Sequence, residues 1–142
     1  MPLIIDLKPG EKIIINGAVI ENAGSSTKLR VHNRANILRQ REIMTAEDAT
    51  TPASLVYFCL QCAYIFTEER AKYLVKLSEY LKQYIEACPS ATEIASEIMA
   101  DVDDGTYYRG LKAARALMKH EETVLENLHR LAQAAEAGQA PE

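Results

Sequence analysis

The stretch TPASLVYFCLQCAYIF, residues 51–66, determines how the rest of the chain must pack. Thr51 can cap a helix and Pro52 suits the first helical turn, so a helix is predicted from here to about Phe66. Apolar side chains fall on almost every face of this helix, and a helix with that pattern has to be buried on all sides. We therefore expect residues 51–66 to be the central element of the fold.

Three more helices are predicted after this one. The second begins at Thr67, carries one apolar stripe and stops at Cys88-Pro89. Ser90 caps a short third helix, and a long fourth helix covers about 107–135 with a rough seven-residue apolar repeat that Glu121 interrupts. Fewer than four heptads are present, so we expect this last helix to pack on the other helices, with dimerisation as the alternative.

The N-terminal 43 residues show short strands instead of helices. Asn16-Gly17 is the dipeptide that a tight hairpin turn needs, and residues 27–32 alternate strictly between apolar and polar. Strands are predicted near 3–5, 12–15, 18–20, 27–32 and 37–41. So few short strands require a partner chain or the helical half to bury their faces. The predicted fold class is α+β, a small N-terminal antiparallel sheet followed by a C-terminal bundle of about four helices.

Charge is distributed unevenly along the 142 residues, whose net charge is −4. Residues 1–44 hold seven basic and four acidic residues, whereas the remainder is strongly acidic. We interpret residues 1–44 as a basic β-rich module, residues 45–137 as an acidic helical domain and residues 138–142 as a frayed tail. This asymmetry is typical of a protein whose basic part meets a polyanion.

Several classes of protein are not expected. The chain has no apolar run of 18 residues and no signal-peptide pattern, so it is predicted to be cytoplasmic, without membrane contact. Cys59 and Cys62 form a C-x-x-C inside the apolar helix, where they are expected to be small buried core residues. No nucleophile motif, phosphate-binding glycine loop or complete metal-ligand set appears. We expect no enzyme activity, no metal or other cofactor and no small-molecule substrate.

The basic residues of the strands are the remaining functional candidates. Acidic residues are absent from Gly24 to Gln40, and Lys28 with Arg30, then Arg39 with Arg41, are predicted to share strand faces. Such residues form either an ordinary solvated sheet face or an edge that attracts phosphates by counterion release. All nine aromatic residues lie after residue 56, so the sheet itself cannot stack on bases. Contact with RNA would have to come from arginine, lysine and strand backbone.

Five motifs spread over nearly the whole chain resemble the FlbT family of flagellar biosynthesis repressors. They are LKPGE (7–11), INGAVI (15–20), LRQREIM (38–44), TPA (51–53) and GTYYRGL with AR (105–111 and 114–115). The resemblance implies a post-transcriptional regulator that binds the 5′ untranslated leader of flagellin mRNA and blocks translation or promotes decay. The resemblance also implies that the protein acts together with the flagellar protein FlaF. Some members of the family act as activators.

Residues 1–44 are also similar to the carbon storage regulator CsrA. The similarity lies in GEKIII (10–15), KLRV (28–31) and Arg41-Glu42. It implies an intertwined dimer whose first and last strands grip a GGA-containing RNA loop. The arginine of the last strand matches Arg41, while the arginine of the first strand falls at Leu7 here.

The leading hypothesis is an RNA-binding repressor of flagellin expression. Arg39, Arg41, Lys28 and Arg30 would contact phosphates or base edges, with Lys8 and Lys12 at the rim. A homodimer is expected, formed through either the N-terminal strands or the long helix. The alternative is a protein-interaction module or co-regulator of flagellar assembly, bound to FlaF or other flagellar proteins and acting on RNA indirectly. Its motivating feature is the acidic half with its tyrosines, namely Tyr73, Tyr80, Tyr84, Tyr107 and Tyr108.

Overall fold

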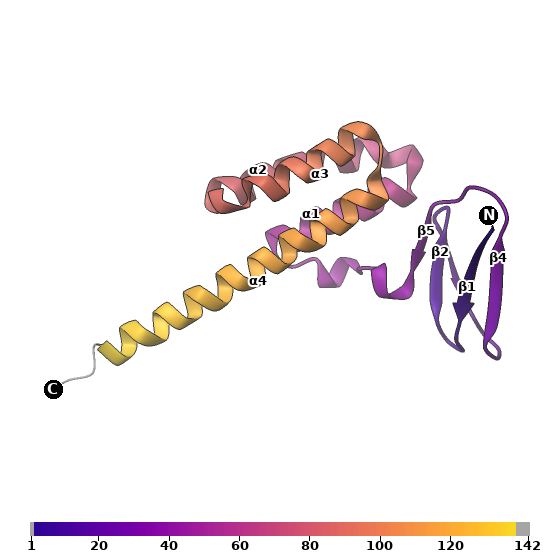
Figure 1. The fold of residues 1–142 in the computed structure, drawn as a ribbon, viewed down its shortest axis with the longest axis horizontal. Helices are drawn as coiled ribbons and strands as arrows, with labels where there is room; N and C mark the ends of the chain where they lie inside the picture. Colours follow the sequence, from indigo (N-terminus) through magenta and orange to yellow (C-terminus); the bar gives the residue numbers. More distant parts are fainter. Residues whose placement is uncertain (1, 139–142) are drawn as a thin grey trace.

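A computed structural model describes residues 2–138 and places the strands at one end of the helices (Figure 1). The strands are β1 (Leu3–Leu7), β2 (Lys12–Ile15), β3 (Ala18–Glu21), β4 (Thr27–Val31) and β5 (Ile37–Arg39). The helices are α1 (Pro52–Ile65), α2 (Arg70–Ala87), α3 (Thr92–Asp104) and α4 (Tyr107–Gly138). The predicted α+β class, with antiparallel strands first and helices after, is confirmed.

The strands form two small sheets, one with the order β1-β4 and one with the order β3-β2-β5. The predicted hairpin between β2 and β3 is confirmed, because Asn16 has φ 51° and Gly17 has φ 86°, as its tight turn requires. A Cβ on Gly17 would lie 3.2 Å from the carbonyl oxygen of Ile65. The hairpin tip therefore packs directly on the end of α1.

Strand β2 joins the sheets to the helices because its two faces are both buried. Ile13 packs with Ile5 and Leu7 between the two sheets. Ile14 belongs instead to the helical core, together with Leu38 of β5. The alternation of side chains along a strand thus connects one core to the other. The helical half covers the strands only on the side of Ile14 and Leu38, whereas Ile4 and Val19 are 51% and 65% exposed.

One strand ends earlier than predicted. We expected Arg39 and Arg41 to share a face of a strand that covers residues 37–41, but β5 ends at Arg39 and residues 40–42 form a 3-10 turn, η1. The cause lies in two side chains that replace strand pairing. The Gln40 side chain accepts the N–H of Lys12 at 2.6 Å, and the Glu42 carboxylate accepts the N–H of Arg39 at 2.9 Å.

Helix α1 begins as predicted, and a distant residue completes its N-terminus. The Thr51 hydroxyl accepts the N–H of Ser54 at 3.3 Å, and the Glu121 carboxylate accepts the N–H of Ala53 at 3.0 Å. Glu121 thus occupies a core-facing position of α4 because it satisfies a free donor of α1. The predicted starts at Thr67 and Ser90 fall in short 3-10 turns that lead into α2 and α3.

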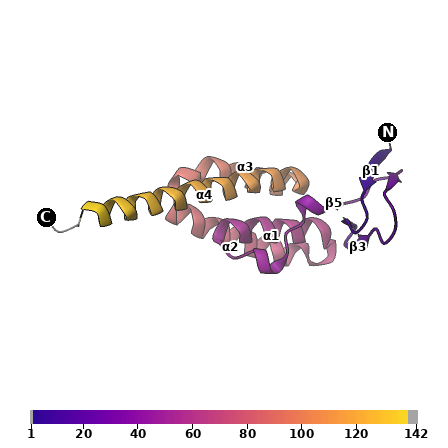
Figure 2. The same ribbon diagram turned by 90° about the horizontal axis from the view of Figure 1, so that it is seen from below.

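Helix α4 packs on the bundle over its first half and extends past it over its second half (Figures 1 and 2). Leu111 and Leu117 are buried, whereas Leu125, Leu128 and Leu131 are 53%, 57% and 67% exposed. The expected packing on the other helices therefore holds only for the first half. Residues 139–142 of the predicted tail lie outside the described residues. No helix within 2–138 is both long and apolar enough to cross a membrane.

One face of α1 holds the chain that follows the strands. Tyr57, Gln61 and Tyr64 lie on this face at helical spacing. Each forms hydrogen bonds with main-chain groups through its hydroxyl or amide group. The Tyr64 hydroxyl accepts the N–H of Ile37 at 3.1 Å, and the Tyr57 hydroxyl donates to the Glu42 carbonyl at 2.5 Å. The Gln61 amide accepts the N–H of Met44 and donates to its carbonyl, both at 2.8 Å.

We predict that Gln61→Leu lowers the free energy of unfolding by about 1–3 kcal/mol, because both main-chain groups of Met44 lose their partner. Gln83→Leu on the exposed face of α2 is the matched control and should change it by less than about 0.5 kcal/mol. Urea denaturation of the two variants and the parent protein measures both values. Equal stability of the two variants would contradict the role given to Gln61.

Candidate nucleic-acid interface

A pocket of about 180 Å³ lies where β1, β2, β5 and η1 meet. Four of the six predicted RNA-binding residues line it, namely Lys8, Lys12, Arg39 and Arg41. Asp6 and Glu11 are the acidic residues at its wall, so cations exceed carboxylates. Tertiary structure thus gathers basic residues from both ends of the predicted module into one place.

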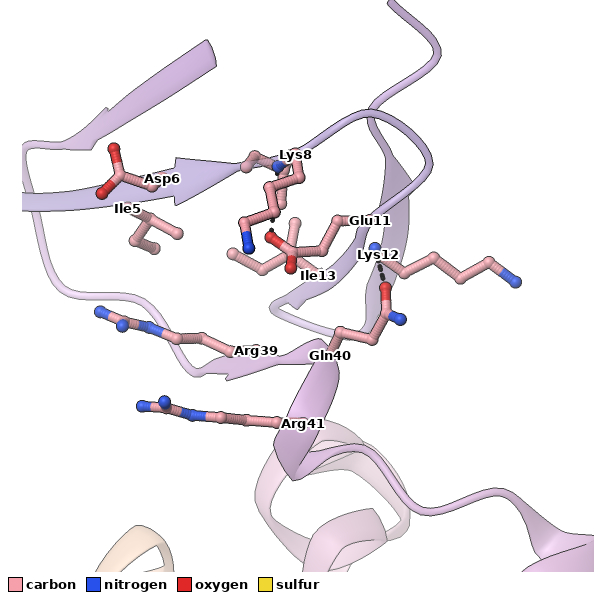
Figure 3. Close-up of a pocket in the computed structure, with 10 residues that line it drawn as sticks. Ile5, Asp6, Lys8, Glu11, Lys12, Ile13, Arg39, Gln40 and Arg41 are labelled. Carbon is pink, nitrogen blue, oxygen red and sulfur yellow. Dashed lines mark hydrogen bonds between the residues drawn. The ribbon is translucent and has the colours of Figure 1, made fainter. Parts of the chain in front are cut away.

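The four cations do not point the same way (Figure 3). The side chains of Arg39 and Arg41 run parallel from β5 and η1, whereas the Lys12 side chain points away from them. Two neighbouring guanidinium groups can each offer a planar pair of donors to a phosphate. Arg39 and Arg41 are therefore the first candidates for binding an anion, with Lys8 and Lys12 lining the same pocket.

Leu7 occupies the position at which CsrA-like proteins would carry an arginine. It is 4% exposed and packs with Ile5 and Ile13 between the two sheets. A long cation could not replace it without loss of this small core. Leu7 thus belongs to the packing of the sheets, and the cations that line the pocket come from other positions.

Lys28 and Arg30 lie apart from the pocket. Both are exposed on β4, opposite Asp6 and Ile4 of β1. The Lys28 ammonium lies 3.7 Å from the Asp6 carboxylate, and this is the one ion pair recorded within residues 2–138. The structure therefore places these two predicted residues on the neighbouring sheet, with the charge of Lys28 partly balanced.

Aromatic side chains that are distant in the sequence lie beside the strands. Tyr64 of α1 and Tyr108 of α4 have ring centroids 5.8 Å apart, and both line a cleft of about 380 Å³ that also contains Arg70 and Arg109. Reasoning from the sequence missed this cleft, because no aromatic residue is near the strands along the chain. The GTYYRGL motif at 105–111 was its visible signal.

Helix α4 contacts the main chain that carries the two arginines. The Arg115 guanidinium donates to the carbonyl oxygen of Arg41 at 3.2 Å, and the Tyr108 hydroxyl donates to the Glu42 carboxylate. The bond to Glu42 raises the pKa of Tyr108 to about 12, so its hydroxyl remains a protonated donor at neutral pH. Glu42 is thus directed toward α4 and the Arg39 N–H.

The cysteines behave as predicted. Cys59 and Cys62 are buried and form no disulfide. Burial raises the pKa of both thiols, that of Cys62 to about 11, so neither is a thiolate at neutral pH. Their interpretation as core residues is confirmed. Among residues 2–138 there is no group of three or more histidine, cysteine, aspartate or glutamate residues that could hold a metal ion.

Comparison with known proteins identifies the family. The family model for flagellar protein FlbT matches residues 3–125. The chain is 37% identical over 125 residues to the probable flagellum biosynthesis repressor protein FlbT of Rhodopseudomonas palustris strain TIE-1, a match that covers 88% of this chain and 98% of the relative. It is 32% identical over 124 residues to the flagellum biosynthesis repressor protein FlbT of Caulobacter vibrioides strain ATCC 19089, covering 86% and 88%.

A further relative, from Bradyrhizobium diazoefficiens, is 36% identical over 123 residues, with 86% of this chain and 84% of the relative covered. It carries the name probable flagellum biosynthesis repressor protein FlbT 1. No solved structure matches the chain. The family model and these relatives all cover the strands and the helical core together, and the chain accordingly belongs to the FlbT family of flagellar proteins.

Proposed function

We propose that this protein represses flagellin expression by binding the 5′ untranslated leader of flagellin mRNA, where it blocks translation or promotes decay. The names of the relatives support a repressor of flagellum biosynthesis. The parallel guanidinium groups of Arg39 and Arg41 beside a pocket are the observation that supports an anionic ligand. The leader is a single-stranded or looped polyanion whose phosphates and base edges suit such donors.

The charge state of the pocket favours this ligand. No ion pair involving Arg39, Arg41, Lys8 or Lys12 is recorded within residues 2–138. Their cations are therefore available to replace the counterions of RNA, which is the main source of affinity for a polyanion. Lys28 and Arg30 on the adjoining sheet would make weaker contacts, because Lys28 already faces Asp6.

We predict that Arg39→Ala/Arg41→Ala weakens binding of the flagellin leader RNA. If each arginine holds one phosphate of a single strand, the slope of log K against log salt becomes smaller by about 1.4. Lys76→Ala/Lys82→Ala is the control, because it removes the same charge from exposed positions of α2. Titration of labelled RNA with each purified protein at several salt concentrations measures affinity and slope. Unchanged values for the arginine variant would disprove the site.

If the protein is instead an interaction module for other flagellar proteins, the purified protein should behave differently in the RNA titration. Of the tyrosine stripe of α2, Tyr84 gives this alternative no support, because this side chain is buried and its hydroxyl lies 2.8 Å from His120 Nδ1. If the natural protein co-purifies with FlaF or another flagellar protein in fixed proportion, and the purified chain alone binds no leader RNA, the RNA effect is indirect. Binding of RNA by the chain alone would rule that alternative out as the full explanation.

The expected homodimer stays a prediction. The exposed leucines of α4 continue the seven-residue spacing of its buried half, so the α4 of a second copy has the matching pattern. We expect sedimentation to show a dimer and Leu125→Gln/Leu128→Gln to convert it to a monomer. Val75→Gln, which removes an equally exposed apolar side chain from α2, should leave the dimer intact. A dimer that survives the leucine substitutions would point to the strands instead.

A further inference from the structure

The start of α4, up to His120, contains no acidic residue. Residues 105–120 contain none, although the whole chain has 20, and they include Arg109, Lys112, Arg115 and Lys119. This segment belongs to the half of the chain that is acidic overall. Its local charge is opposite to that of its surroundings in the sequence. The division into a basic sheet and an acidic helical body therefore does not hold at this position.

The helix places three of these cations in one row. Lys112, Arg115 and Lys119 follow Tyr108 at intervals of four, seven and eleven residues, which lie on one face of an α-helix. All four side chains are exposed. From Tyr108 to Lys119 the row extends about 16 Å along the helix axis. We call Tyr108, Lys112, Arg115 and Lys119 the α4 row.

The α4 row adjoins the pocket at Arg41. The Arg115 guanidinium donates to the Arg41 carbonyl at 3.2 Å, and Arg41 and Arg115 line a common cleft of about 190 Å³. Arg41 also lines the pocket between the sheets. Residues 22–41, which contain no acidic residue either, thus meet residues 105–120 in space. Two segments that α1, α2 and α3 separate along the chain form one basic surface.

Two carboxylates, those of Glu42 and Asp48, line the cleft that Arg41 and Arg115 share, and both accept hydrogen bonds. Glu42 accepts from the Arg39 N–H and from the Tyr108 hydroxyl, and Asp48 accepts from the Thr45 hydroxyl at 2.8 Å. No ion pair of the α4 row is recorded within residues 2–138. Acidic residues three or four positions away would pair with these cations and stabilise the helix, and this face carries none before Glu121.

We propose that the α4 row is a second part of the RNA-binding surface, along which a single strand continues from the pocket. The cations would hold successive phosphates, and the Tyr108 ring, 39% exposed, would stack on a base. This inference rests on the proposed function, because it assumes that RNA occupies the pocket. An aromatic ring at the end of a row of cations favours RNA over an acidic protein segment.

The experiment compares the flagellin leader RNA bound to the parent protein, to Lys112→Gln/Lys119→Gln and to Lys76→Gln/Lys82→Gln. Both substituted pairs remove two exposed lysines, from α4 and from α2 respectively, and neither pair makes a recorded side-chain hydrogen bond. The α4 pair should weaken binding and make the salt slope smaller by about 1.4, one contact for each lysine. The α2 pair should bind as the parent does, and equal melting temperatures confirm that all three are folded.

A second comparison tests the ring. Tyr108→Phe removes the hydroxyl bond to Glu42 and keeps the ring, whereas Tyr108→Leu removes both. Stacking predicts that the leucine variant binds RNA more weakly than the phenylalanine variant at equal salt slope. Equal affinity of these two variants would overturn the stacking contact.

The arginine pair of the pocket separates failure of this inference from failure of the proposed function. If Arg39→Ala/Arg41→Ala loses RNA binding and Lys112→Gln/Lys119→Gln binds as the parent does, only the inference about the α4 row is wrong. A parent protein that binds no leader RNA overturns both proposals. If the α4 pair instead loses binding to a flagellar protein and not to RNA, the row is a protein-docking surface and the inference is wrong.

Discussion

The position of the candidate site depends on three hydrogen-bonding side chains of α1. Tyr57, Gln61 and Tyr64 hold the main chain between β5 and the linker to α1 at three successive points. Buried main-chain groups need partners, and here α1 supplies them where strand pairing has ended. The segment that carries Arg39 and Arg41 therefore rests on a helix that is itself largely buried.

Enclosure of α1 explains the order of the remaining elements. An apolar helix without a solvent face has to be covered on every side, and α2, α4 and the β2–β5 edge share that task. Ile14 and Leu38 make the sheet part of this cover. The Glu121 carboxylate of α4 accepts a main-chain N–H at the N-terminus of α1. The sheet is therefore packed directly against the helices, and a continuous surface can cross from one to the other.

The charged residues are distributed differently in space than their order along the chain suggests. The net charge of −4 and the acidic helical half suggest that only the strands meet a polyanion. The structure instead joins two acid-free segments, one that ends at Arg41 and one at the start of α4. The acidic residues lie mainly on other segments.

The sequence by itself determined the elements, because each depends on neighbours along the chain. Alternation predicts the strands, Asn16-Gly17 the hairpin, and the Thr51-Pro52 start with its apolar run the central helix. It also identified the basic residues of the pocket. Only tertiary structure decided that β5 stops at Arg39, that Lys28 and Arg30 lie outside the pocket, and that Tyr108 and Arg115 lie beside it. These outcomes depend on bonds between distant segments, which no local pattern encodes.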